Sequence, residues 1–380
     1  MPGSKRERSP GKWTLTVTLG ADYTGKKIRF NKTFHGTAAE AEKALALFYA
    51  DCERGLTSQS SELTIKDMVL AYIQDRPKDS LKENTISGYN VILSNWIEPY
   101  IGSLKTNKVK PRQLQKWIDD LSDKYSPKTV NNAKSLLSAS FERLLKYGEI
   151  QKNPCTHIVM PKPAKKEAKF YNQEETAAFI KALGQLPKDR IVDKVIFELA
   201  LFCGLRKGEI LGLDWQDVST TDCTVKIRQT RYTKKSSPMR EDTPKTEKSQ
   251  RIVGFPEPMK KDFIALASFY SERKLMLGPE WIDSPAVIRG VWGSPMYGTL
   301  PLKHLNAFQE EYGLKRITLH QLRHTNVSAM IALGLDIKTI QERGGYSTAR
   351  TPLEIYGHLF TQQDQKIAAD IYDRMLGNNE

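Results

Sequence analysis

Cysteine is scarce in this chain of 380 residues, and no two cysteines stand in a CxxC spacing. The four that occur are scattered, at Cys52, Cys155, Cys203 and Cys223. Their scatter offers no template for a zinc site, and their small number fits a reducing compartment. We therefore expect a cytoplasmic protein without a zinc site.

Long apolar runs are also missing. No run reaches the ~18 residues that a membrane-spanning helix needs. The segment from Met1 to Lys12 is basic, but no apolar stretch follows it, so we expect no secretory signal and interpret it as a flexible basic tail. These two absences predict a protein that has no membrane partner.

Two signatures of metal and nucleotide chemistry are absent as well. The sequence has no carboxylate cluster of the kind that a two-metal nuclease requires, and it has no Walker motif. We therefore expect chemistry that needs no metal ion, no ATP and no other cofactor.

Positive charge is in excess. The chain carries 58 Lys and Arg against 44 Asp and Glu, a formal net charge of +14. This balance favours a polyanionic partner, nucleic acid first and an anionic membrane surface second, although a basic protein with solvated lysine faces remains the plain alternative. Hydrophobic residues make up 39% of the chain, enough for a sizeable core, and its length allows two or three domains.

Residues 1–58 are predicted to form a small three-stranded sheet backed by one helix. Apolar residues alternate with threonines over Trp13–Leu19, which is typical of a half-buried strand, and Ile28–Phe34 suggests further strand structure. Thr37–Glu40 matches a capping box that opens a helix to about Arg54.

Basic residues lie on or beside these strands, at Lys12, Lys26, Lys27, Arg29 and Lys32. A sheet laid in a DNA groove is a known mode of docking. A solvated sheet face is the alternative interpretation.

Residues 62–160 are predicted to form a compact bundle of four short helices, which follow a polar linker at 55–63. Apolar residues recur at helical spacing behind four start signals, Thr64, Asn84, Pro111 and Ser126. The stripe of the third helix consists of Leu114, Trp117, Ile118 and Leu121.

Residues 168–380 are predicted to form a mixed, mostly helical domain with a small β-sheet, after a basic linker at 161–169. We expect a buried helix over Asp193–Cys203 and strands at Thr224–Thr230 and Arg251–Phe255. Further helices are expected near 258–276, 301–312, 319–334 and 336–343. The whole chain is thus predicted to be a multidomain α+β protein.

Three local patterns in this last domain suggest chemistry. In the first, Gly204 ends one helix and Arg206 starts another, with Glu209 placed one turn later to hold the guanidinium. In the second, Thr318 caps a helix that carries His320 and Arg323 on one face, a pair that suits a phosphate site. Each pattern alone also fits an ordinary helix start.

The third pattern is a helix start at Thr351 and Pro352 that places Tyr356 on the first turns. Tyr356 is one of 15 tyrosines, and a tyrosine on a helix is more often part of the packing than of an active site. The order of the three patterns along the chain gives this tyrosine its weight.

Taken in order, these residues resemble the signature of the tyrosine recombinase family, also called lambda-type or phage integrases. That signature is an arginine, a lysine, His-x-x-Arg, a histidine or tryptophan, and a tyrosine. The matching residues are Arg206, His320, Arg323 and Tyr356, with Lys245 as the lysine of a hairpin just before Arg251. Lys248, in the same turn, is a weaker candidate.

One position departs from the family pattern. Where the family carries histidine or tryptophan between glycine and serine, this chain has Tyr346, in Gly345-Tyr346-Ser347. A tyrosine hydroxyl donates a hydrogen bond as imidazole or indole does. The substitution therefore either preserves the supporting role or slows the enzyme.

The resemblance implies a mechanism. Tyr356 attacks the scissile phosphate and forms a 3′-phosphotyrosyl link, and His320 acts as base or orienter. Arg206 and Arg323 clamp the non-bridging oxygens, and Lys245 protonates the departing 5′ oxygen. No ATP is needed, because the covalent bond stores the energy of the phosphodiester.

The resemblance also implies partners. These are double-stranded DNA, with arm sites bound by the N-terminal sheet and core sites bound by the helical bundle, and further copies of the chain in a tetrameric synaptic complex. Excision factors and host DNA-bending factors are further expected partners in integrating and excising a mobile element. The tail over Thr361–Leu376 has apolar residues at helical spacing and is expected to pack either on a neighbouring copy or on its own core.

Two other functions remain open. One is a DNA-binding relative with impaired catalysis, of which Tyr346 is the first sign. The other is an enzyme resembling type IB topoisomerases, which shares the chemistry but needs no defined site; the separate basic N-terminal domain argues against it.

Overall fold

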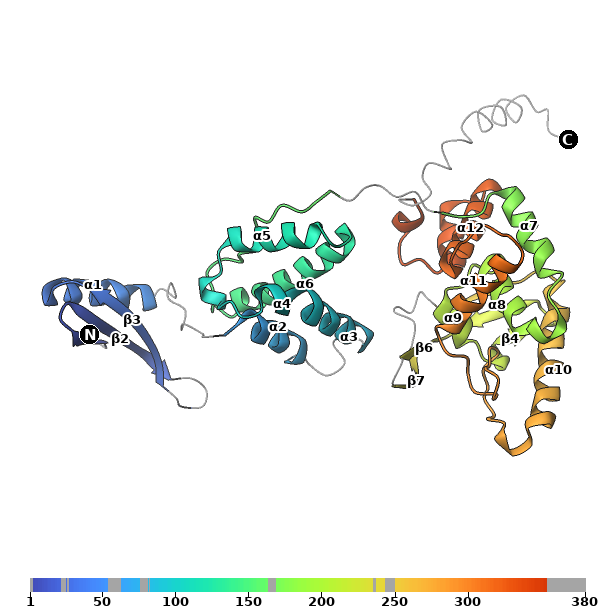
Figure 1. Ribbon diagram of the computed structural model, residues 1–380, viewed down its shortest axis with the longest axis horizontal. Coiled ribbons are helices and arrows are strands. Elements are labelled where there is room, and N and C mark those ends of the chain that lie inside the picture. The colour runs from blue at the N-terminus through green and yellow to red at the C-terminus, as the bar shows by residue number, and fades with distance from the viewer. Residues whose placement is uncertain are drawn as a thin grey trace, which may run out of the picture. The chain divides into compact units, whose positions relative to one another are not determined.

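The computed structural model describes residues 3–21, 25, 27–53, 63–75, 81, 83–162, 169–234, 237–242 and 250–353. The chain divides into two compact units, Met1–Lys165 and Lys166–Glu380 (Figure 1). The first unit contains a small sheet with its helix and a helical bundle, and each of these has its own apolar core.

The N-terminal sheet is antiparallel with the order β1-β2-β3, and helix α1 lies along it (Figure 1). Its elements are β1 (Gly3–Ser9), β2 (Lys12–Ala21), β3 (Lys27–His35) and α1 (Ala38–Glu53). The predicted alternation on β2 is confirmed, since Leu15 and Val17 are fully buried against α1. The capping box is confirmed too: the backbone N–H of Thr37 donates to Glu40 Oε2 (2.8 Å).

The prediction of a flexible tail over Met1–Lys12 is wrong. Gly3–Ser9 forms strand β1, which pairs with β2 so that Gly3 lies opposite Val17. β1 is an edge strand with mostly exposed side chains, so its sequence carries no hydrophobic alternation. Backbone hydrogen bonds to β2 hold it in place, and these leave no trace in side-chain hydropathy.

The helical bundle follows the predicted start signals closely. Its helices are α2 (Ile65–Gln74), α3 (Glu83–Ile92), α4 (Glu98–Ile101), α5 (Pro111–Ser122) and α6 (Pro127–Lys146), with a 3₁₀ turn at Thr106–Lys108. Thr64 and Ser126 cap α2 and α6, and the predicted apolar stripe of α5 is buried.

The second predicted helix differs in two respects. Asn84 lies inside α3, which begins at Glu83, so it is not the cap. Beyond Ile92 the helix continues through a π turn at Leu93–Ile97 into α4. Pro99 has no N–H with which to continue the regular i→i−4 pattern, which accounts for a wider turn just before it.

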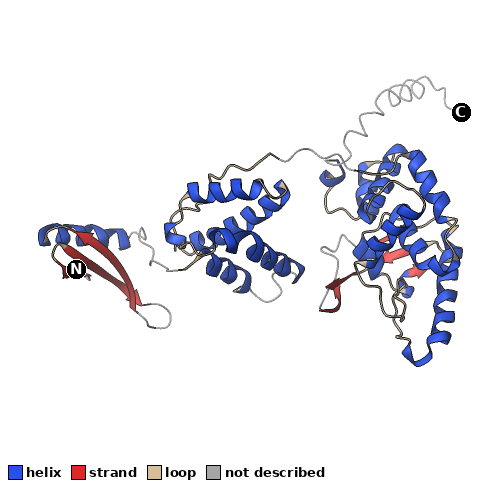
Figure 2. Cartoon of the chain, viewed as in Figure 1, coloured by secondary structure: helices blue, strands red, loops and turns tan. Residues whose placement is uncertain are grey.

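The second unit is mostly helical around small antiparallel sheets (Figure 2). Its helices are α7 (Gln173–Leu183), α8 (Ile191–Phe202), α9 (Lys207–Gly212), α10 (Met259–Leu277), α11 (Leu300–Glu311), α12 (Leu319–Ala332) and α13 (Ile337–Gly344), with 3₁₀ turns at Lys188–Arg190, Trp215–Asp217 and Gly278–Glu280. One sheet has the order β4-β5-β8, from Val218–Ser219, Thr224–Ile227 and Arg251–Gly254. The other is the hairpin of β6 (Thr230–Lys234) and β7 (Ser237–Asp242).

Helix α8 is the centre of this unit. Nearly its whole length is buried, and α10, α11 and α12 pack on it. It confirms the buried helix predicted at Asp193–Cys203, and the four later helices are confirmed as well, whereas α7 was not predicted. Because α8 ends directly before Gly204, the core fixes the position of the turn that carries Arg206.

Two negative findings apply to the residues that the structure describes. None of their helices is long and apolar enough to cross a membrane. No group of three or more His, Cys, Asp or Glu side chains among them is arranged to hold a metal ion.

Candidate active site

Four of the six predicted catalytic residues come together in the second unit. Arg206, at the start of α9, and Arg323, on α12, both lie against the ring of Tyr346, with guanidinium carbons 5.7 and 4.6 Å from the ring centroid. His320 lies one turn before Arg323 on α12. Lys245 and Tyr356 fall at 243–249 and 354–380, outside the described residues.

Arg206 is held on two sides and is still open to solvent. Gly204 turns the chain with φ +62°, and Arg206 then caps α9. Its Nη1 donates to Glu209 Oε1 (2.7 Å), as the sequence predicted, and its Nη2 donates to the carbonyl of Gly345 (2.8 Å). The side chain is 37% exposed, so a ligand can reach its guanidinium.

Glu209 is a buried carboxylate that two arginines share. Arg251, on β8, donates from Nη1 to Oε1 (3.1 Å) and from Nη2 to Oε2 (3.0 Å). Burial acts to raise the pKa of Glu209, but the hydrogen bonds and charge of Arg251 and the charge of Arg206 outweigh it and lower that pKa to about 2. Glu209 is therefore ionised at neutral pH.

Arg323 is almost completely buried, at 1% exposure. Its Nη1 donates to the carbonyl of Gly204 and its Nη2 to that of Gly344, both at 2.5 Å. Its Nε is buried and has no hydrogen-bond partner within the described part of the chain. Burial of such a donor without a partner is unfavourable, and the atom is also closed to solvent in this structure.

His320 and His324 lie edge to face on α12, with ring centroids 4.6 Å apart. Burial, followed by the charges of Arg323 and Arg206, lowers the pKa of His320. Burial, followed by His320 and Arg323, lowers the pKa of His324 to about 4. Both rings are therefore neutral at pH 7, and a neutral imidazole can accept a proton.

Tyr346 contacts the arginines through the face of its ring. It follows Gly345, which ends α13 in the left-handed conformation, and its N–H donates to the carbonyl of Gln341 (2.9 Å). Its ring makes a cation–π interaction with two guanidinium groups, and support from its hydroxyl stays a prediction.

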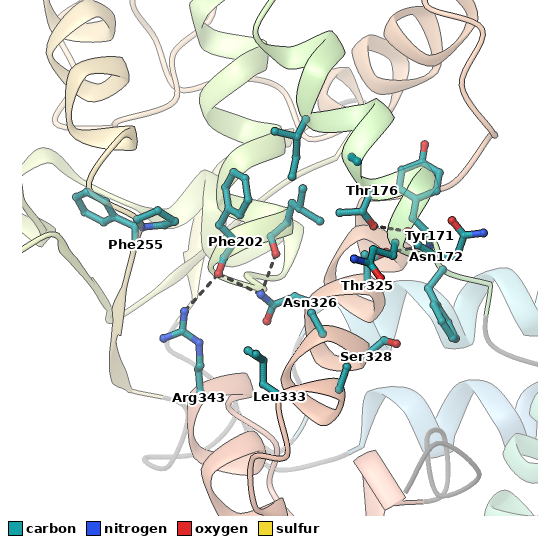
Figure 3. A pocket seen from close by; sticks show the side chains of 18 of the residues that line it. Tyr171, Asn172, Thr176, Phe202, Phe255, Thr325, Asn326, Ser328, Leu333 and Arg343 are labelled. Carbon is teal, nitrogen blue, oxygen red and sulfur yellow. Dashed lines mark hydrogen bonds between the residues drawn. The ribbon is translucent and has the colours of Figure 1, made fainter. Parts of the chain in front are cut away.

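A second set of side chains donates hydrogen bonds to the end of α8, just before the turn at Gly204 (Figure 3). Asn326 Nδ2 donates to the carbonyls of Leu201 (2.8 Å) and Phe202 (3.0 Å), at the end of α8. Arg343 Nη2 donates to the carbonyls of Phe202 (3.3 Å) and Gly254 (3.0 Å). These residues border a mainly apolar cavity of about 890 Å³, and none of the four predicted catalytic residues that the structure describes lines it.

Sequence reasoning missed Arg251, Arg343 and Asn326. Arg251 was noted only as the first residue of a predicted strand. Its position just after the predicted hairpin lysine is the one local signal that could have drawn attention to it.

The histidine pair predicts a pH dependence of stability. Because the pKa of His324 is lower in the folded protein than its ordinary value of 6.5, protonation favours the unfolded chain. The stability is complete above about pH 6.5 and declines as the pH falls toward 4. We expect His324→Gln to reduce the loss of unfolding free energy between pH 7 and pH 4 by about 1–2 kcal/mol, measured by urea denaturation. An unchanged difference between the two pH values would show that His324 titrates normally.

The arrangement suits a tetrahedral anion. A partly exposed guanidinium, a buried guanidinium and a neutral imidazole lie close together in the unit. Planar guanidinium groups recognise phosphate oxygens, and their charge stabilises negative charge that develops there.

Comparison with protein families gives two matches. The model of the phage integrase family matches residues 169–363, and that of the phage integrase N-terminal SAM-like domain matches residues 64–122.

Two similar proteins cover nearly the whole chain. The ICEBs1 integrase of Bacillus subtilis is 26% identical over 375 residues, which span 98% of this chain and 100% of that protein. A tyrosine recombinase XerC-like protein of Caldanaerobacter subterraneus is 27% identical over 384 residues, 96% of each chain.

Solved structures show the same fold. The integrase of transposon Tn1549 in complex with transposon right-end DNA superposes with a TM-score of 0.67 at 18% identity, covering 77% of this chain and 95% of that one. A lambda integrase dimer bound to a COC′ core site gives a TM-score of 0.55 at 15% identity, covering 93% and 95%.

Proposed function

Because this chain belongs to the phage integrase family of tyrosine recombinases, we propose that it integrates and excises a mobile element by cutting and rejoining DNA through a covalent link to Tyr356. The observation that supports this most directly is the convergence of Arg206, His320, Arg323 and Tyr346 around one place suited to a phosphate. Arg206, the α12 residues His320 and Arg323, and Tyr346 come from three separate segments of the sequence, so their convergence depends on the fold and not on local structure alone.

In the proposed cleavage step, Tyr356 Oη forms a bond to the scissile phosphorus and the bond to the 5′ oxygen breaks. The phenol proton passes toward His320, whose neutral ring can take it, and Lys245 gives a proton to the departing 5′ oxygen. Rejoining is the reverse, with the 5′ hydroxyl of another strand as the nucleophile. The number of phosphoester bonds is conserved, so no nucleotide is consumed.

The two arginines have different roles in this proposal. Arg206 is partly exposed and approaches the phosphate from the solvent side. Arg323 is buried, is fixed by two carbonyls and lies against the ring of Tyr346, and in this proposal it contributes its positive charge. Negative charge that develops on the non-bridging oxygens is stabilised by donors already in place.

We assign the parts of the chain to three domains. Residues 1–58 bind arm sites, 62–160 bind core sites, and 168–380 carry the catalytic residues. The exposed side chains of Lys12, Lys27, Arg29 and Lys32 on the N-terminal sheet favour the first assignment. On DNA, four copies form the synaptic complex, with excision and host DNA-bending factors as further partners.

The proposal predicts covalent capture without metal or ATP. The substrate is a nicked duplex copied from the end of the element that carries this gene, called the junction duplex below. We expect the full chain to form an adduct with it that survives denaturation, at an unchanged rate in excess EDTA and without ATP, because the one carboxylate of the described cluster, Glu209, is occupied by two arginines.

The outcomes separate the competing functions. Loss of the adduct in EDTA would contradict metal-free chemistry. Binding of the junction duplex without any adduct would favour a catalytically impaired relative. Relaxation of supercoiled plasmids that lack the junction sequence would favour an enzyme of the type IB topoisomerase kind.

A further inference from the structure

Three arginines from three separate elements donate to three consecutive carbonyls at the end of α13. Arg251 Nε donates to Arg343 O (2.8 Å), Arg323 Nη2 to Gly344 O (2.5 Å) and Arg206 Nη2 to Gly345 O (2.8 Å). The last carbonyls of a helix have no partner within it and carry the negative end of its dipole. The three guanidinium groups therefore fix this end of α13 by charge and by hydrogen bonds.

Arg251 differs from Arg206 in its surroundings. Its side chain is 7% exposed, and its described hydrogen bonds go to both oxygens of Glu209 and to the carbonyl of Arg343. So deep a guanidinium, with its donors directed at protein acceptors, is poorly placed to bind DNA itself.

From this geometry we propose that Arg251 is a positioning residue for strand cleavage, which acts through Glu209 on Arg206 and through the end of α13 on Tyr346. The inference rests on the proposed function, because it assigns to Arg251 the task of placing the phosphate clamp. Arg251 itself touches neither the phosphate nor the nucleophile in this proposal.

Glu209 accepts hydrogen bonds from both Arg251 and Arg206, and this links the position of one arginine to that of the other. With Arg251 present, Glu209 accepts two hydrogen bonds from that residue, one from the guanidinium of Arg206 and one from the backbone N–H of Arg206. Without Arg251, a buried carboxylate would be left under-partnered, which is unfavourable, and Arg206 would be the nearest cation able to satisfy it. Arg206 would then turn inward, away from the phosphate.

Gly345 fits the same arrangement. It has φ +61°, and a Cβ built there would lie 2.6 Å from Arg251 Nη1. A glycine at this position allows the guanidinium of Arg251 to lie directly against the turn. The turn and the arginine thus form one packed unit that leads into Tyr346.

The test compares full-length Arg251→Met and Arg251→Lys with Arg190→Met. Arg190 is the matched control, because it also pairs with two carboxylates, Asp193 and Glu311, but at the other end of α8. For Arg251→Met we expect single-turnover cleavage of the junction duplex to slow by about 10- to 100-fold, as for a catalytic group moved by about 1 Å, while the Kd for that duplex changes less than about twofold. Arg251→Lys should recover part of the rate, since lysine keeps the positive charge but lacks the planar guanidinium that donates to both oxygens of Glu209.

A second readout does not depend on activity. The rate at which phenylglyoxal modifies Arg206, followed by mass spectrometry, should fall several-fold in Arg251→Met, because Arg206 turns inward, and stay at the wild-type value in Arg190→Met. An unchanged Arg206 rate, or cleavage by Arg251→Met within twofold of wild type, overturns the inference. If Arg251→Met does not fold, the same two criteria apply to Arg251→Lys. If the wild-type chain itself forms no adduct, the proposed function fails, and the phenylglyoxal comparison still decides whether Arg251 positions Arg206.

Discussion

Replacing Tyr356 by phenylalanine is expected to abolish the covalent adduct with the junction duplex while leaving DNA binding intact. Phenylalanine has no oxygen that can attack phosphorus, so the rate should fall by about 10⁴-fold or more, the scale seen when a nucleophile is removed. The measurement is a denaturing gel of the reaction beside a binding titration. Binding should persist, because the basic surfaces of the first unit are unchanged.

Tyr346→Phe is the matched control for this variant, since it also removes one phenol oxygen. Its ring can still lie against Arg206 and Arg323, so we expect adduct formation to continue. If Tyr356→Phe still formed adducts and Tyr346→Phe did not, the two tyrosines would have been assigned the wrong roles.

Arg206→Lys is expected to have the second largest effect. Lysine keeps the positive charge, but its single nitrogen cannot reach Glu209, Gly345 and a phosphate oxygen at once. The planar guanidinium of Arg206, with its three separated nitrogens, can. We expect the single-turnover rate to fall by about 10²- to 10³-fold, equivalent to about 2.7–4 kcal/mol of transition-state stabilisation. The Kd for the junction duplex should change little.

Arg228→Lys provides the control for Arg206→Lys. Arg228 is 39% exposed and is paired with Asp217, close to the 37% exposure of Arg206 and its pairing with Glu209. Arg228 is not part of the cluster around Tyr346, so the Arg228→Lys protein should cleave at the wild-type rate. Equal losses in the two variants would mean that the loss does not come from the cluster around Tyr346, and would contradict the role of Arg206.

The sequence predicted those parts of the fold that depend on local signals. Thr64, Ser126 and Thr318 cap their helices because a side-chain oxygen there satisfies a free N–H, and α8 is apolar enough to be recognised as buried. Strand β1 was missed because backbone pairing holds a sequence of polar, exposed residues.

The site was predictable in its residue types and not in its geometry. Arg206, His320 and Arg323 stood out by spacing and by family resemblance. The role of Arg251 depends on contacts across 42 residues to Glu209 and 92 residues to Arg343, which no local pattern reveals. The contact between the ring face of Tyr346 and Arg323 depends on the fold in the same way.

The most direct test of the central claim is to identify the residue that carries DNA. The wild-type adduct with the junction duplex is digested with nuclease and protease, and the modified peptide is sequenced by mass spectrometry. We predict a nucleotide attached through its 3′ phosphate to Tyr356. Attachment at any other residue, or a chain that binds the duplex and carries no nucleotide, would contradict the proposed mechanism.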